Sequence, residues 1–136
     1  MAAEILNAII TETSITHEPK HDVESFIYVL AYSVTRNAVQ FGSRNLDQAT
    51  RQKLHNFFYS NFGQMTLDDI YSSRRGQVPL IVGSRFPSAI SSPMVELMDE
   101  LDELLAESRL KRKGNPKVLT HACVLSALDN AIAKMI

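Results

Sequence analysis

The sequence predicts an all-α protein, and two observations support this fold class. Apolar residues recur at the 3.6-residue period of a helix along most of the 136-residue chain, whereas no segment shows the clean period-2 alternation of a half-buried strand. The periodic segments are separated by residues that typically cap or stop helices, namely Asp, Ser, Thr, Pro and Gly. We therefore expect about five or six helices in one domain, with neither an internal repeat nor a linker.

The N-terminal part predicts a short helix and then a long central one. A helix over Ala2–Ile10 is followed by a polar loop, Thr11–His21, which contains Pro19. Asp22 then caps a helix that runs to about Val39. Because its apolar residues occupy more than one face, this helix should lie in the middle of a core. These residues are Phe26, Ile27, Val29, Leu30 and Val34.

Two further helices are marked by their caps. One should start at Asp47 and end near Gly63, where a glycine commonly stops a helix. A second, short helix should open with Thr66 and Asp69, which resemble a capping box, and stop at Gly76. The residues of the first helix that are expected to face the core are Leu54, Phe57, Phe58 and Phe62.

The next segment, Val78–Ser91, reads as an irregular loop, although V-P-L-I-V would also suit a short strand. Its helix breakers are Pro79, Gly83 and Pro87.

The clearest predicted helix runs from Pro93 to about Lys111, with Ser92 as its cap, and ends before Gly114 and Pro116. Its acidic residues lie in the N-terminal half and its basic residues at the C-terminus, as the helix dipole favours. The apolar stripe comprises Met94, Leu97, Met98, Leu101, Leu104 and Leu105.

A last helix is expected over Thr120–Met135. Its predicted inward residues are Val124, Leu125, Leu128, Ile132 and Met135.

The composition of the chain indicates which classes of binding partner and which cellular compartments are not expected. A net charge of −1 gives no cationic surface for nucleic acid or an anionic membrane. The longest nearly continuous apolar run, Phe26–Val34, is about half the length of a membrane span, so we expect a soluble chain that does not cross a bilayer. The N-terminus has no basic segment of the kind found in signal peptides, and the single Cys123 suits a reducing compartment. The expected location is the cytoplasm or nucleus.

No metal or catalytic site is predicted. His17, His21 and Asp22 contain metal-ligating groups, yet Pro19 interrupts the helix that would place the two histidines on one face. Loop polarity and a helix cap account for them.

The remaining chemical groups near the C-terminus have structural explanations. His121 and Cys123 are two residues apart and point to different sides of a helix, and no base is placed beside the thiol, so a buried, inert cysteine is expected. The basic run Arg109–Lys113 suits a solvated helix end. We therefore expect no cofactor and no catalytic residue.

Two boxes near the N-terminus carry a resemblance to a known family. M-A-A-E-I-L at Met1–Leu6 resembles the A-P-E box that ends a kinase activation segment, and H-D-V-E-S-F-I-Y-V-L at His21–Leu30 resembles the start of the central helix of the kinase C-terminal lobe. Together they are similar to the fungal-type protein kinase family. The match is strongest over residues 1–40, and the ending L-T-H-A-C-V-L-S-A-L-D-N-A-I also looks like that family.

The resemblance implies structural roles for Glu4 and Asp22. In kinases the acidic residue of the first box pairs with an arginine late in the lobe, and Glu4 matches it; an ordinary exposed glutamate is the alternative. The aspartate that opens the central helix holds the backbone of the catalytic loop, and Asp22 matches it, although a helix cap alone would explain this residue. The candidate partners of Glu4 are Arg74, Arg75, Arg85 and Arg109.

The catalytic parts of a kinase do not occur in this sequence. The Gly-rich loop, the strand-borne lysine, the H-R-D-x-x-x-x-N loop and the D-F-G box are all missing, so the chain should be inactive alone. Three hypotheses follow: a fragment of a kinase domain of the transferase class, a non-catalytic module that binds a protein partner, or an unrelated helical bundle. In the first, one side of Phe26–Val34 should lack its cover and favour self-association or a protein partner.

Overall fold

The computed structural model describes all residues except 1, 15, 17, 64–65 and 110–117. Within the described residues all regular structure is helical, which confirms the predicted all-α class. Short 3₁₀ turns occur at Gly42–Asn45, Val78–Ile81 and Pro87–Ala89. The α-helices are α1 (Ala3–Ile10), α2 (Pro19–Gln40), α3 (Gln48–Phe62), α4 (Leu67–Arg75), α5 (Val82–Arg85), α6 (Ser92–Arg109) and α7 (His121–Met135).

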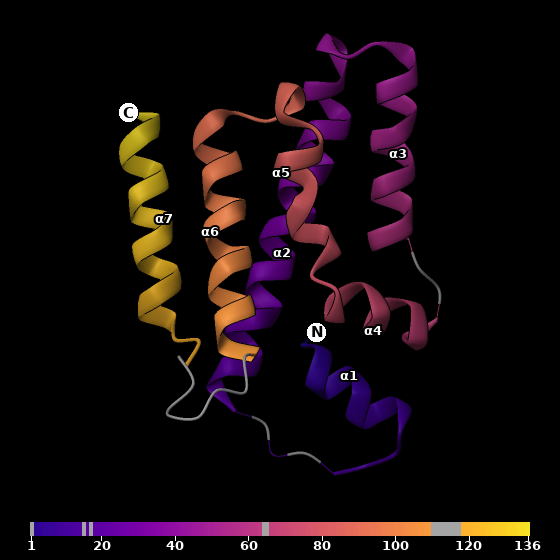
Figure 1. Ribbon diagram of the computed structural model, residues 1–136, viewed down its shortest axis with the longest axis vertical. Coiled ribbons are helices and arrows are strands. Elements are labelled where there is room, and N and C mark those ends of the chain that lie inside the picture. The colour runs from indigo at the N-terminus through magenta and orange to yellow at the C-terminus, as the bar shows by residue number, and fades with distance from the viewer. Residues whose placement is uncertain (1, 15, 17, 64–65, 110–117) are drawn as a thin grey trace.

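The long helix α2 organises the molecule. It lies between α3 and α6, and α7 packs on the far side of α6 (Figure 1). The short helices α1 and α4 pack against each other near the end of the bundle where α2 begins (Figure 1). The predicted central position of this helix is therefore confirmed.

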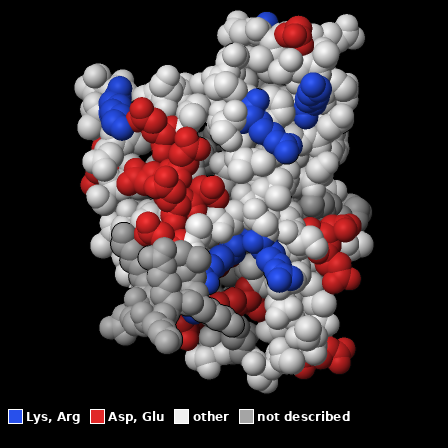
Figure 2. Space-filling model, viewed as in Figure 1, with Lys and Arg blue, Asp and Glu red and all other residues white. Residues whose placement is uncertain are grey.

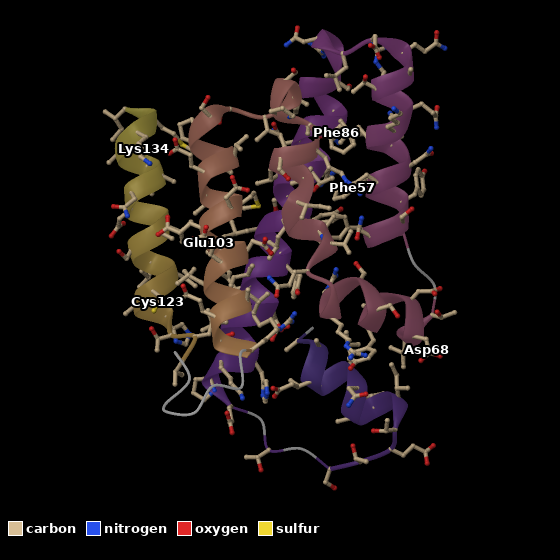
Figure 3. The ribbon with its side chains drawn as sticks, viewed as in Figure 1. Phe57, Asp68, Phe86, Glu103, Cys123 and Lys134 are labelled. Atoms are coloured by element: carbon tan, nitrogen blue, oxygen red, sulfur yellow. The ribbon has the colours of Figure 1, made fainter. Side chains whose placement is uncertain are left out.

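The core lies between α2, α3, α5 and α6. From α3, Phe57 contacts Phe86 edge to face, with ring centroids 5.7 Å apart, and Figure 3 labels both rings. The fully buried apolar side chains include Ile27, Leu54, Leu80, Val82, Met98 and Leu101.

The predicted helix starts at Asp47 and Thr66 are confirmed, and the structure adds a cap at Thr120. Asp47 accepts a hydrogen bond from the Thr50 amide at 2.6 Å, and α3 ends before Gly63. Thr66 likewise accepts from the amide of Asp69, and Thr120 from that of Cys123. A side-chain acceptor at the start of a helix satisfies amide groups that have no intrahelical partner.

The predicted loop over Val78–Ser91 is wrong in part, because two 3₁₀ turns and α5 occupy most of it. Pro79 and Pro87 each lie at the start of a 3₁₀ turn, where no backbone N–H is needed. Burial of Leu80 and Val82 fixes these turns against the core. The next helix, α6, begins at Ser92, which the sequence predicted as the cap just before the helix. The expected end of this helix at Lys111–Pro116 lies outside the described residues.

The predicted inward stripe of α7 is wrong at three of its positions. Leu125, Ile132 and Met135 are at least half exposed. The helix instead packs through Val124 and two buried alanines, Ala127 and Ala131. Small side chains allow two helices to approach closely, so the larger residues remain on the flanks of the contact.

Candidate functional site

Polar side chains gather where α1 meets the first turns of α2. Glu4 Oε2 lies 2.7 Å from Nε2 of His21, and Glu4 Oε1 lies 3.6 Å from the Lys20 ammonium. The His21 ring is buried, and its Nδ1 accepts a hydrogen bond from the Glu18 amide at 3.0 Å. Because Nδ1 is an acceptor, a neutral His21 carries its proton on Nε2 and donates it to Glu4.

The resemblance implied an arginine partner for Glu4, and the structure places a histidine and a lysine there instead. Of the four candidate arginines, Arg109 pairs with Glu24, while Arg74 stacks on aromatic rings. The ion pair between α2 and the end of α6 therefore involves a different glutamate from the expected one.

Glu24 is the centre of the second cluster. Its buried carboxylate accepts from the Ala3 amide at 3.1 Å and from Nη2 of Arg109 at 2.5 Å. Arg109 also donates to the carbonyl oxygens of Arg74 and Arg75 at 3.0 and 3.1 Å. One carboxylate and one guanidinium thus join the start of α1, the first turns of α2 and the ends of α4 and α6.

Tyr28 extends this cluster by one helical turn. Its hydroxyl donates to the Arg74 carbonyl at 2.7 Å, and burial raises the pKa of Tyr28 to about 12. His21, Glu24 and Tyr28 lie at i, i+3 and i+7, on one face of α2. The sequence analysis did not predict the structural roles of His21 and Glu24, although their helical spacing to Tyr28 indicates that the three residues share one face.

The prediction that Asp22 caps the central helix is wrong. The helix begins at Pro19, so Asp22 lies in its first turn and is exposed. A proline fits the first position of a helix because its fixed φ suits the helix and no N–H is needed there. Asp22 still carries a negative charge near the positive end of the helix dipole, which is favourable.

These clusters offer no catalytic arrangement. Both ring nitrogens of His21 are engaged in hydrogen bonds and the ring is buried, so it suits a structural role. Among the described residues no group of three or more His, Cys, Asp or Glu side chains could hold a metal ion. His17 lies outside these residues, and Cys123 is half-buried where a buried thiol was expected.

A second feature is an apolar surface shared by α2 and α7, which we call the α2–α7 face. Phe26 and Val29 of α2 are 46% and 59% exposed, although the sequence predicted them inside the core. A cavity of about 270 Å³ lies beside Phe26, lined on the α7 side by Val124, Leu125 and Leu128.

Charge on the visible surface is uneven. Asp and Glu gather over α6, and Lys and Arg lie over the neighbouring elements (Figure 2). Glu96 of this acidic group forms an ion pair with Lys134 of α7. In the part of the chain that the structure describes, no helix is both long and apolar enough for a membrane span.

The fold and the site define an all-helical protein with a structural network of ion pairs. Comparison of the chain with models of protein families, with curated proteins and with solved structures found no match.

We expect Glu4→Gln to lower the free energy of unfolding by about 0.5–1 kcal/mol at pH 7, because Glu4 is half exposed and solvent screens its ion pairs. The His21 hydrogen bond lowers the pKa of Glu4 below 4.5; burial opposes this and Lys20 adds to it. A lowered folded-state pKa gives stability that is present above the unfolded pKa and lost as the pH falls through the folded value.

Urea titrations of the parent and of Glu4→Gln at pH 7 and at about pH 3 test this expectation. The difference between the two proteins should shrink at the lower pH, whereas the exposed control Glu12→Gln should stay near the parent at both. An equal difference at both pH values would show that the Glu4 carboxylate contributes nothing through its charge.

Proposed function

We propose that this chain is the helical C-terminal-lobe part of a fungal-type protein kinase domain, and that alone it does not transfer phosphate. The observation that carries the proposal is that the two sequence boxes contact each other in the fold. Residues 3–6 of the M-A-A-E-I-L box begin α1, which is hydrogen-bonded through Ala3 and Glu4 to the first turns of the central helix α2. In a kinase lobe the end of the activation segment is also held against the helices, although there the acidic residue pairs with an arginine, whereas Glu4 meets His21 and Lys20.

The α2–α7 face also supports this proposal. Phe26 and Val29 lie on the longest helix of the fold and yet remain open to solvent. In the proposed lobe, helices and the catalytic loop that precede the activation segment would cover them.

The absence of phosphate-handling groups from the sequence supports inactivity of this chain. Phosphoryl transfer depends on positioning and on charge stabilisation by a lysine, magnesium-binding carboxylates and a catalytic aspartate. None of the sequence motifs that supply these groups occurs in the 136 residues.

Reading the coding sequence upstream of Met1 in frame tests the proposal. An H-R-D box and a D-F-G box at kinase spacing support it, and an upstream frame that encodes neither contradicts it.

A non-catalytic binding module is the second candidate, and the α2–α7 face is the observation that favours it. Such a module would bury Phe26 and Val29 against a protein partner, since exposed apolar patches often mark interaction sites. A partner recovered at fixed stoichiometry, and lost from the double variant Phe26→Ser/Val29→Ser, would favour this second function.

We expect the isolated chain to self-associate or to bind an apolar dye strongly through the α2–α7 face. The variant Phe26→Ser/Val29→Ser should reduce both signals, because it removes the two exposed apolar groups that α2 contributes to that face. Leu67→Ser serves as the control, since Leu67 is a single exposed leucine on α4. Light scattering and dye fluorescence measure the effect, and a parent protein that is monodisperse, monomeric and free of dye binding would contradict it.

A further inference from the structure

A small cavity between α2, α3 and α4 has the features of a ligand site. Its volume is about 210 Å³, and aromatic rings form much of its wall. These are Tyr28 and Tyr32 from α2 and Phe62 from α3, and the Tyr32 and Phe62 rings meet edge to face at 5.4 Å. Arg74 of α4 completes the wall.

The guanidinium of Arg74 lacks hydrogen-bond partners for two of its nitrogens. Its guanidinium carbon lies 4.5 Å from the centroid of Tyr28 and 5.6 Å from that of Phe62, so two rings already contact its charge. Nε and Nη1 are enclosed and have no hydrogen-bond partner. Polar groups buried in this way are uncommon in native proteins, because leaving a donor unpaired costs free energy.

The nearest carboxylate does not supply the missing partner. Glu24 interacts with Arg74 only through its charge, and the Glu24 oxygen Oε1 is bonded to Arg109 and to the Ala3 amide. Burial correspondingly lowers the pKa of the Arg74 guanidinium. The positive charge beside the cavity is therefore poorly neutralised by the described residues.

The third guanidinium nitrogen of Arg74, Nη2, is not among its enclosed, unpaired atoms. Arg74 as a whole is half-buried and lines the cavity, and we take Nη2 as the nitrogen that an acceptor there would meet. Ser25 and Val29 of α2 lie beside it in the lining. A negatively charged acceptor would form a charge-assisted hydrogen bond to Nη2 and offset the burial of the cation.

The shape and polarity of the lining favour one kind of anion. A cavity of about 210 Å³ has room for a single ring-sized group, and the faces and edges of Tyr32 and Phe62 suit a flat apolar body. A phosphate near its second ionisation would carry more negative charge than Arg74, the single cationic residue of the described lining, can balance, whereas a carboxylate carries one charge. We propose that this cavity binds a carboxylate on a flat apolar body, with the carboxylate on Arg74 Nη2 and the body against Tyr32 and Phe62.

Titration of the ¹⁵N-labelled chain with benzoate, followed by two-dimensional NMR, tests the proposal. Saturable amide shifts are expected over Ser25–Tyr32 and Ile70–Arg74, and benzyl alcohol, which has the ring without the charge, should not reproduce them. Arg74→Met should weaken benzoate binding by about ten- to hundredfold, the usual effect of losing a hydrogen bond to a charged group. Arg75→Met is the matched control, because Arg75 is adjacent but does not line the cavity.

A second variant keeps the test decisive if Arg74→Met fails to fold. Val29→Trp changes an exposed side chain of the lining and should block the cavity while Arg74 stays in place. The absence of saturable shifts, equal binding of benzyl alcohol, or unchanged benzoate binding by Val29→Trp would each overturn the proposal.

A further titration separates the two sources of such a carboxylate. A short peptide that ends in phenylalanine with a free carboxylate is compared with benzoate. Tighter binding of the peptide than of its C-terminal amide and of benzoate identifies a peptide terminus as the ligand. Binding of benzoate alone identifies a small free acid, and either result supports the carboxylate site.

Discussion

Arg109→Met should lower the free energy of unfolding by about 3–5 kcal/mol, because it leaves the buried carboxylate of Glu24 without its countercharge. The same change removes the hydrogen bonds to the carbonyl oxygens of Arg74 and Arg75 and so loosens the end of α4. Arg109→Lys keeps the charge but loses the forked geometry, and its cost should be smaller. Urea denaturation measures all of these variants.

A double-mutant cycle with Glu24→Gln isolates the ion pair itself. Because Glu24→Gln removes the buried charge, the double variant should cost clearly less than the sum of the two single changes. Arg75→Met is the control; it is an exposed neighbour and should stay within about 0.5 kcal/mol of the parent. A loss below about 1 kcal/mol for Arg109→Met, or strict additivity in the cycle, would contradict the role given to this pair.

Leu101→Ala should cost about 2–5 kcal/mol, since Leu101 is fully buried on α6 and its truncation leaves a cavity. Leu125→Ala is the matched change on α7, where the side chain is 59% exposed, and it should cost no more than about 0.5 kcal/mol. Comparison of their melting temperatures and urea midpoints tests the assignment of the core to α6. Equal costs would place the outer stripe of α7 inside a core.

The local signals in the sequence predicted the helices well. Asp47 and Thr66 cap helices at the predicted starts, because capping depends on groups within three residues of one another. Helix period likewise located the buried stripe of α6. Pro19 was misread as part of a loop, because a proline is compatible both with a loop and with the first turn of a helix.

The polar network could not be predicted in full, because it depends on contacts between distant segments. Glu24 and Arg109 are 85 residues apart, and no local rule pairs them. His21 was considered only as a metal ligand or loop residue, whereas its burial and its bond to Glu4 arise when α1 folds back on α2. The exposure of Leu125 depends in the same way on a distant contact, because it is set by the helix against which α7 packs.

The central claim is the proposed origin of the chain in a kinase C-terminal lobe, and phosphate transfer tests it most directly. The polypeptide encoded by the in-frame upstream sequence together with these 136 residues is incubated with labelled ATP and magnesium, beside this chain alone. The proposal predicts that the longer protein incorporates phosphate, that changing the aspartate of its upstream H-R-D box to Asn abolishes this, and that the chain alone incorporates none. A longer protein that folds but transfers no phosphate, or transfer by this chain alone, would contradict the proposal.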